Sequence, residues 1–322
     1  MKFSGFWKKL GVVCCLSGMM AGALFAAPAD AGQEKVYPEK SILVQDFGNG
    51  SRKLLTPRAV YTGPDGRMVE LIGAVHVGEK QYYKDLEAIF GQCDKLLFEM
   101  VGGEDIPRIG ELQRKLKSGG MLTAEEEKEM EQMLVKAQKV RDDENVLMKL
   151  LGPMYATMAS ALGMVSQKDG IDYYAHSTFV HADMTAAEFD QELEKRGQSI
   201  WSEVTSMSDR QKVRDSMDID LLGMAGALLS GNYRYLKGEA IKLMASAEVG
   251  GKAEKWSVIL DGRNEKCFEV FDSVNKDKEN KHIGIFYGSA HLPGMHRMLL
   301  DRGFKLDKVE WLVAWDTETV PK

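Results

Sequence analysis

Two histidines follow glycines at the same spacing, each near the end of an apolar stretch. The first motif is Gly73-Ala-Val-His76, within LIGAVHVGEK, and the second is Gly288-Ser-Ala-His291, within FYGSAHLPGM. Glycine lacks a Cβ and lets a backbone approach a neighbouring strand or a ligand closely, whereas a neutral imidazole can bind a divalent metal ion. The repeated spacing predicts two histidines that end buried strands and serve one site.

Glu99 and Arg263 are charged residues at positions that the sequence predicts to face the core or the end of a strand. Glu99 ends the apolar run DKLLFEM, and sites in parallel α/β sheets form at the carboxyl ends of strands. Arg263 falls on the core-facing side of a predicted helix, because it shares a helical stripe with Leu260, Cys267, Phe271 and Val274. A buried guanidinium needs a carboxylate, a substrate or an oxyanion opposite it.

These residue types leave two interpretations open. Two imidazoles and one carboxylate could hold a divalent metal ion whose bound water becomes hydroxide near neutral pH. Alternatively, the histidines are hydrogen-bonded core residues and Glu99 is the ion-pair partner of Arg263. The duplicated placement of the histidines favours a functional site, since packing alone has little reason to choose histidine twice.

The elements around both motifs predict strand–helix–strand units. Strands and helices are expected in a hairpin with its turn at 63–66, a helix at 79–90, a strand at 94–101, a strand at 282–291, a helix at 292–303 and a strand at 307–315. We interpret the two units as an internal duplication, in which Leu312 of the second takes the place of Glu99. The fold class is therefore α/β (α+β): a central mixed sheet from two β-α-β halves, each with a Gly-x-x-His strand end, plus a large helical insertion.

The domain organisation follows from this pattern. A first half at 51–103 and a second half at 281–322 flank a mainly helical insertion at 104–280, and 32–50 forms an N-terminal arm. Capping boxes start helices of the insertion at Thr123 and Thr185. Its Met-rich segments at 147–165 and 220–231 predict packed helices, with a groove for peptide or lipid as the alternative.

The N-terminus predicts export. Lysines precede an apolar run from Leu10 to Ala27, and Ala29-Asp30-Ala31 forms a small-residue cleavage site, so residues 1–31 are a signal peptide. The mature protein is then periplasmic or secreted; an uncleaved membrane anchor is the alternative, and membrane contact through this segment or the Met-rich helices stays open. The formal charge of −6 argues against nucleic-acid binding. The remaining cysteines, Cys93 and Cys267, are either paired or two buried thiols.

The motifs LIGAVHVG, LLFEM, DGRNEKCFEVF and IGIFYGSAHLPGMHRMLLDRGF resemble the TraB/GumN/Tiki family, which is related more distantly to the erythromycin-esterase and ChaN-like proteins. The resemblance spans roughly residues 55–315. Its Tiki branch implies metal-dependent peptide hydrolysis without an HExxH helix, and other branches imply inhibition of peptide pheromones. Carried onto this chain, it implies a metal or catalytic centre of His76, Glu99 and His291, with Arg263 and Asn264 beside it and Asp183 as a supporting candidate.

We therefore expect an exported metal-dependent hydrolase, a protease or peptidase, with a peptide or protein substrate. The resemblance favours Mn or Co, with Zn or Fe as alternatives. The rival expectations are a non-catalytic protein that sequesters a peptide in the same cleft and a hydrolase of non-peptide esters. His176 and His181 are more simply explained as residues of a connection, and His282 and His296 as structural residues.

Overall fold

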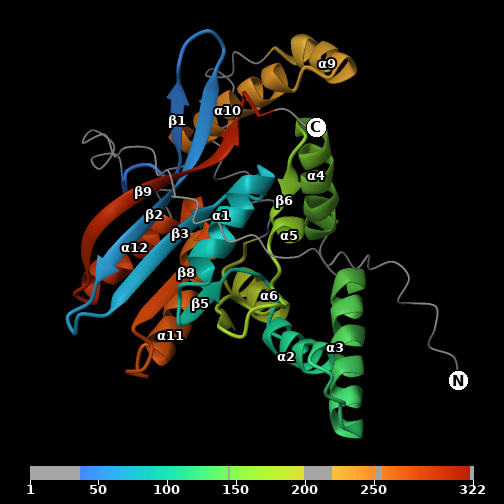
Figure 1. The fold of residues 1–322 in the computed structure, drawn as a ribbon, viewed down its shortest axis with the longest axis vertical. Helices are drawn as coiled ribbons and strands as arrows, with labels where there is room; N and C mark the ends of the chain where they lie inside the picture. The colour runs from blue at the N-terminus through green and yellow to red at the C-terminus, as the bar shows by residue number, and fades with distance from the viewer. Residues whose placement is uncertain (1–36, 144–145, 199–219, 251–255, 320–322) are drawn as a thin grey trace, which may run out of the picture.

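A computed structural model describes residues 37–143, 146–198, 220–250 and 256–319. In this part of the chain, a central mixed sheet of seven strands carries helices on both faces, and helices dominate the segment between residues 104 and 280 (Figure 1). The predicted α/β class with a central mixed sheet is confirmed. The predicted signal peptide, 1–31, lies outside the described residues.

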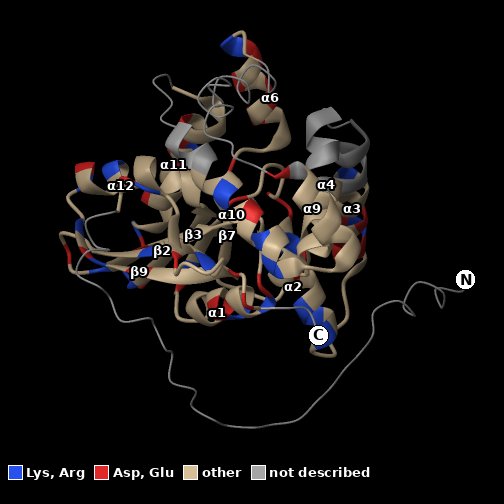
Figure 2. Cartoon of the chain, turned by 90° about the horizontal axis from the view of Figure 1, so that it is seen from above, with Lys and Arg blue, Asp and Glu red and all other residues tan. Residues whose placement is uncertain are grey.

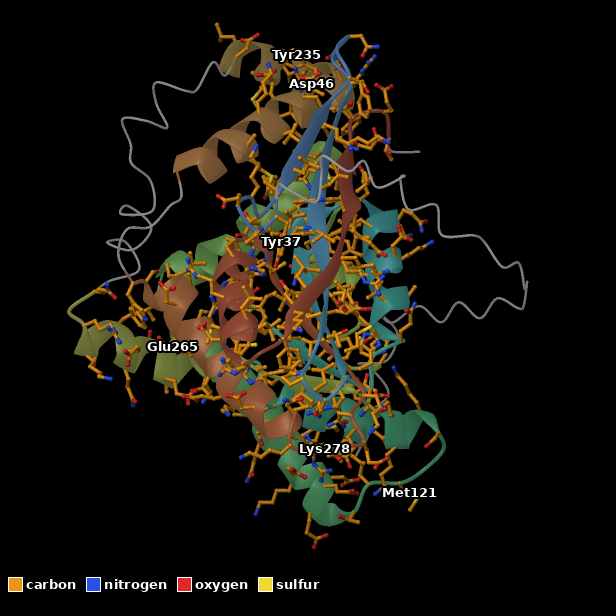
Figure 3. The ribbon with its side chains drawn as sticks, turned by 90° about the vertical axis from the view of Figure 1, so that its left-hand side faces the viewer. Tyr37, Asp46, Met121, Tyr235, Glu265 and Lys278 are labelled. Carbon is orange, nitrogen blue, oxygen red and sulfur yellow. The ribbon has the colours of Figure 1, made fainter. Side chains whose placement is uncertain are left out.

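The antiparallel side of the sheet is built around one long strand, β2 (Arg52–Thr62). It pairs with β3 (Met68–Ala74) through the predicted hairpin, with β1 (Leu43–Asp46), and along its other edge with β9 (Lys305–Asp316). The hairpin closes where Gly63 N donates to Arg67 O at 2.8 Å, and Gly66 adopts φ 81°, which glycine tolerates best. The expected N-terminal arm thus contributes a strand, β1, and the buried Tyr37 (Figure 3).

The parallel side of the sheet has the order β3, β8 (His282–Gly288), β5 (Lys95–Phe98) and β7 (Phe179–His181). The two strands of the first predicted strand–helix–strand unit, β3 and β5, are not paired with each other. Strand β8 lies between them, with Ala74 opposite Gly288 and Phe98 opposite Phe286. The carboxyl end of β8 therefore lies next to the carboxyl ends of both β3 and β5.

Helices cover the two faces of the sheet, as Figure 2 shows from above. Helix α1 (Lys80–Phe90) buries its apolar stripe on one face, as its spacing predicted. Helices α11 (Arg263–Val274) and α12 (Leu292–Asp301) cover the other face. Strand β3 is apolar on both sides, with Ile72 in the first core and Leu71 in the second. Truncating one fully buried side chain of α1, as in Leu86→Ala, is expected to cost about 2–5 kcal/mol.

The predicted helical insertion is mainly helical, although it also supplies β7 to the sheet. Its further elements are α2 (Ile106–Lys117), α3 (Ala124–Asp143), α4 (Val146–Leu162), β6 (Val165–Ser166), α5 (Gln167–Gly170), α6 (Ala186–Lys195), α9 (Leu221–Ser230), α10 (Tyr233–Gly250) and the π-helix η2 (Val258–Gly262). Both predicted capping boxes are present, at Thr123 and Thr185. The short strand β4 (Val77–Gly78), just after His76, pairs with β6.

Two further sequence questions are answered by the fold. Cys93 and Cys267 are both free and buried, one in each core, so they do not form a disulfide. Within the described ranges, no helix has the length and apolarity needed to cross a membrane, and Pro153 lies inside α4.

Candidate active site

The second Gly-x-x-His motif forms the buried side of the site. Strand β8 ends at Gly288, and the chain then passes through a 3-10 turn, Ser289–His291, directly into α12. Gly288 N donates a hydrogen bond of 2.5 Å to the Glu99 carboxylate. Ser289 Oγ donates to the carbonyl oxygen of Ala74 at 3.1 Å, which ties the end of β8 to the end of β3.

Glu99 directly follows β5 and is fixed between two neighbouring elements. Its own backbone N–H donates to Phe286 O of β8 at 3.1 Å, which extends the parallel ladder by one residue. Its carboxylate oxygen Oε2 accepts a hydrogen bond from Gly288 N, and Oε1 accepts one from Arg263 Nη2 at 2.6 Å. The predicted strand-end position of Glu99 is therefore confirmed.

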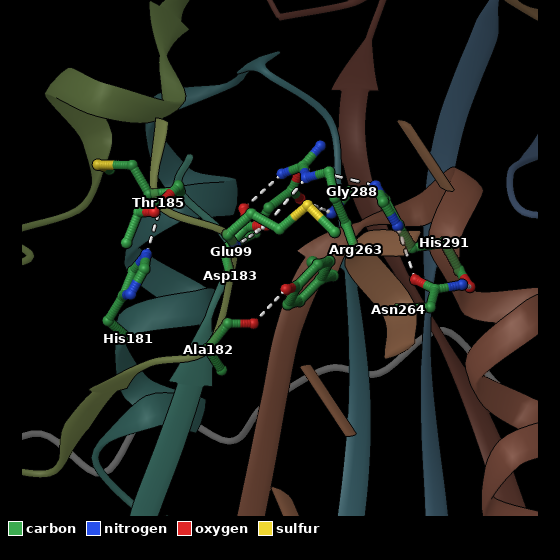
Figure 4. A network of polar contacts seen from close by, with 12 residues as sticks. Glu99, His181, Ala182, Asp183, Thr185, Arg263, Asn264, Gly288 and His291 are labelled. Atoms are coloured by element: carbon green, nitrogen blue, oxygen red, sulfur yellow. Dashed lines mark hydrogen bonds and ion pairs between the residues drawn. The ribbon is translucent and has the colours of Figure 1, made fainter. Parts of the chain in front are cut away.

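Arg263 joins the carboxylates that follow two different strands. It opens α11 immediately after the π-helix η2, and its side chain is 11% exposed, as the predicted core-facing stripe required. Besides Glu99, it pairs with Asp183: Nε donates to Oδ1 at 3.0 Å and Nη2 to Oδ2 at 2.6 Å. Figure 4 shows the guanidinium reaching both acids, so the expected carboxylate partner of Arg263 is confirmed.

The charges in this cluster hold Glu99 and His291 in opposite states. Burial raises the pKa of Glu99, but the positive charge of Arg263, with smaller contributions from His291 and His76, lowers it overall to about 2. Burial lowers the pKa of His291 to about 4, although the charge of Glu99 opposes this change. Near neutral pH, an ionised carboxylate therefore faces a neutral imidazole.

Asn264 determines which nitrogen of His291 carries the proton. Its amide nitrogen donates to the carbonyl oxygen of His291 at 3.3 Å, so its oxygen Oδ1 faces His291 Nδ1 at 2.7 Å and must accept from it. Nδ1 is then the protonated nitrogen. The lone pair of Nε2 is left on the side of Glu99, whose Oε1 lies 3.7 Å away (Figure 4).

His76 occupies a different environment. It follows β3 by two residues, is exposed, and its ring lies against Tyr155 of α4 with centroids 4.8 Å apart and planes at 33°. Its carbonyl oxygen accepts Gln167 N at 2.8 Å, next to the β4–β6 pair. The structure thus brings Glu99, Arg263, Asp183, Asn264 and His291 together by direct contacts, whereas in the described ranges no hydrogen bond or ion pair joins the His76 side chain to this group.

Two of the three predicted metal ligands, His291 and Glu99, lie at a separation that a metal ion could bridge. In the described parts of the chain, no group of three or more His, Cys, Asp or Glu side chains is arranged to hold a metal ion. The 3.7 Å between His291 Nε2 and Glu99 Oε1 is nevertheless close to the roughly 3–3.5 Å that separates two donors on one metal at bond lengths of about 2.1 Å. The donor chemistry of this pair is therefore suitable, and His76 is the third donor only if its exposed ring moves toward it.

The other histidines make structural contacts. His176 pairs with Glu87 at 2.5 Å, His181 Nε2 contacts Met100 O at 2.7 Å, His282 lies 3.1 Å from Glu70, and His296 contacts Tyr61 at 2.8 Å. The sequence had assigned His282 and His296 to such roles. The sequence reasoning missed Tyr155, because a tyrosine within a Met-rich apolar helix carries no signal of its own.

A polar pocket of about 440 Å³ adjoins the site between α6 and α11. Its lining includes Met184 and Gly262, the chain neighbours of Asp183 and Arg263, and Glu265, which Figure 3 places at the surface. Trp256 also lines this pocket, with the Arg196 guanidinium 3.4 Å from the centre of its ring. The pocket offers space for a polar ligand beside the buried ion-pair cluster.

Comparison with known proteins identifies the family. The model of the TraB/PrgY/gumN family matches residues 60–308, which include the predicted site residues, and the chain therefore belongs to this family. No curated protein matches the sequence.

Proposed function

We propose that this TraB/PrgY/gumN-family protein is an exported metal-dependent hydrolase that cleaves peptides or proteins. The observation that supports the proposal is the neutral His291, whose Nε2 lone pair is directed toward the side of an ionised Glu99. A paired imidazole and carboxylate of this kind serve either as metal ligands or as acid and base in hydrolysis.

His291 and Glu99 would hold the metal ion, with His76 as a third ligand. A divalent cation bound there would supply a water of lowered pKa, and the family resemblance favours Mn or Co over Zn or Fe. Asn264 fixes the tautomer and orientation of His291, and Arg263 keeps Glu99 charged within the buried cluster. Such supporting partners typically change metal affinity by about 10–100-fold when they are removed.

Arg263 has a second role in this proposal. Its Nε and Nη2 are used by Asp183 and Glu99, whereas its Nη1 donates no hydrogen bond to any residue in the described ranges. We assign this free edge to the substrate carbonyl, where it would oppose developing negative charge. Replacement by Lys would keep the charge but lose the planar fork that spans two carboxylates.

The test combines metal binding with hydrolysis. We expect the protein purified from residue 32 onward to bind about one equivalent of Mn or Co, measured by calorimetry and elemental analysis, and to cleave members of a peptide mixture followed by mass spectrometry. His291→Ala should abolish stoichiometric binding, and Asn264→Ala should weaken it by about 10–100-fold. His176→Ala, at a histidine outside the cluster, is the matched control and should bind as the wild type does. Full metal occupancy and activity in His291→Ala would refute the centre.

Glu99→Gln separates the two roles of the carboxylate. If Glu99 is a ligand, as we propose, metal affinity and turnover fall together. If it is only a base, metal stays bound while turnover falls by roughly 10²–10⁴-fold. Because the amide also weakens the contact with Arg263, the melting temperature of this variant must be measured alongside.

The second candidate function is peptide sequestration without catalysis. It is favoured by the direct Arg263–Glu99 contact of 2.6 Å. This contact gives Glu99 a structural partner and weakens the attraction between its carboxylate and a metal cation. A protein of this kind would bind peptides in the same experiment with no bound metal and no cleavage. Hydrolysis of non-peptide esters is a further alternative, which parallel assays with ester substrates would detect.

A further inference from the structure

Tyr155 places a phenol at the exposed side of the candidate site. It lies on α4, whose Ala159 and Leu162 are buried in the core on the α1 side of the sheet. The helix is followed directly by β6, which pairs with β4 next to His76, and Gln167 N then bonds to the carbonyl oxygen of His76. These contacts hold the backbone at His76 next to α4, so the proximity of Tyr155 to His76 follows from the fold.

The hydroxyl of Tyr155 differs from those of four buried tyrosines of the protein. Those hydroxyls have partners: Tyr82 donates to Gly73 O, Tyr83 to Val75 O, Tyr173 contacts Gln167, and Tyr287 donates to Ala182 O. Tyr155 is half-buried, and within the described ranges its hydroxyl makes no hydrogen bond. A tyrosine whose ring is partly buried normally directs its hydroxyl toward a hydrogen-bond partner, because one end of the side chain is apolar and the other is polar.

The phenol lies on the same side of the candidate site as His76, because the two rings are in contact. A tyrosine hydroxyl can donate a hydrogen bond through its proton.

We propose that Tyr155 contacts the substrate and donates a hydrogen bond to the oxygen of the scissile carbonyl. The inference rests on the proposed hydrolase function, and no proton is transferred in this role. The donor is available before the substrate arrives, whereas most of the donors of Arg263 are already used by Asp183 and Glu99. A preorganised donor of this kind acts most strongly in the transition state, when negative charge collects on the oxygen.

The test compares two replacements of Tyr155 with a control. Tyr155→Phe keeps the ring against His76 and removes only the O–H, whereas Tyr155→Leu removes both. Tyr174→Phe, at an exposed tyrosine of the 171–178 connection, is the control and should behave as the wild type does. For Tyr155→Phe we expect kcat to fall by roughly 10²–10³-fold, with KM and Mn affinity within about twofold of the wild type.

Two readouts besides turnover separate a substrate contact from a structural role. A peptide phosphonate, which imitates the tetrahedral anion, should bind Tyr155→Phe more weakly by a factor similar to the loss in kcat, while the cleaved product peptide binds unchanged. Tyr155→Leu should in addition shift the His76 ring signals in NMR spectra, which Tyr155→Phe should leave in place. Unchanged kcat and phosphonate affinity in Tyr155→Phe would overturn the inference.

The failure of this inference is distinguishable from failure of the proposed function. A wild-type protein that binds Mn and cleaves peptide, together with a fully active Tyr155→Phe variant, overturns the role of Tyr155 alone. A wild-type protein that neither binds metal nor cleaves peptides or esters overturns the proposed hydrolase and the role of Tyr155 with it.

Discussion

The two Gly-x-x-His corners share a sequence pattern but differ in their surroundings. His291 is buried on the α11 and α12 side of the sheet, next to Tyr287 and held by Asn264. His76 is exposed, and its neighbour Tyr155 packs against the core on the α1 side. Equal spacing therefore placed two histidines at adjacent strand ends without giving them equal environments.

The glycines of the two corners differ in the atoms that surround them. A Cβ on Gly73 would lie 2.8 Å from Ser289 Oγ and 3.1 Å from both Leu292 and Pro57. A Cβ on Gly288 would meet only Glu99, at 3.3 Å, and His291, at 3.7 Å. The exposed histidine thus follows a glycine required by packing, and the buried histidine follows a glycine required by the carboxylate. The glycine of the first corner is therefore set by side-chain packing, while the glycine of the second lies against the charged groups.

The largest effect is expected from Arg263→Met, which removes the cation of the buried corner. Glu99 and Asp183 would remain buried with no compensating charge, so we expect the free energy of unfolding to fall by about 3–5 kcal/mol, measured by urea denaturation. Arg302→Met is the control, because Arg302 pairs with Asp272 at the surface and should contribute no more than about 1 kcal/mol. Equal small losses would show that the cluster is not electrostatically coupled.

The next largest loss of stability is expected from replacing the glycines of the two Gly-x-x-His motifs. Gly73→Ala is expected to cost about 1–3 kcal/mol, because the new methyl group overlaps side chains packed between β3 and α12. Gly288→Ala should destabilise the protein less, while it disturbs the contact between Gly288 N and Glu99 and so reduces metal affinity. Thermal unfolding and Mn titration on both variants test this division, and the reverse pattern would contradict it.

The last prediction concerns the pH dependence of stability. The pKa of His291 is lowered by burial to about 4 in the folded protein, against 6.5 for an ordinary histidine. Between these values the unfolded chain binds a proton that the folded protein does not, so stability should fall as the pH decreases from about 6.5 to about 4. His291→Gln should flatten this part of the curve in chemical denaturation at several pH values. A slope unchanged by the substitution would show that another group titrates there.

Much of the fold followed from local patterns. The hairpin turn, the buried stripe of α1 and the capping boxes depend on neighbouring residues, and these predictions are confirmed. The position of β8 between β3 and β5 depends on contacts between distant residues, so periodicity gave no sign of it. The strand β7 was missed for a related reason, because a strand of three residues within a helical segment has no measurable period.

The part of the candidate site that could be predicted is the ion pairing of Arg263. A guanidinium on a core-facing stripe needs a compensating negative group, and in the structure it pairs with two carboxylates. The spacing of the motifs could not distinguish a buried imidazole from an exposed one, since burial depends on which helix covers the strand end. The placement of His76 against α4, and with it Tyr155, follows from the β4–β6 pair, in which Val77 pairs with Ser166 and Gly78 with Val165, so it leaves no local pattern in the sequence.

The insertion of β8 between β3 and β5 also determines when the candidate site can form. The contact between Gly288 and Glu99 joins residues 189 positions apart, and Arg263 is 164 positions from Glu99. While the chain is being synthesised, β3 and β5 emerge long before the strand that must separate them, so the nascent N-terminal half cannot close the sheet correctly by itself. Contacts of such long range are slow to form. The charged cluster therefore assembles only after nearly the whole chain has left the ribosome.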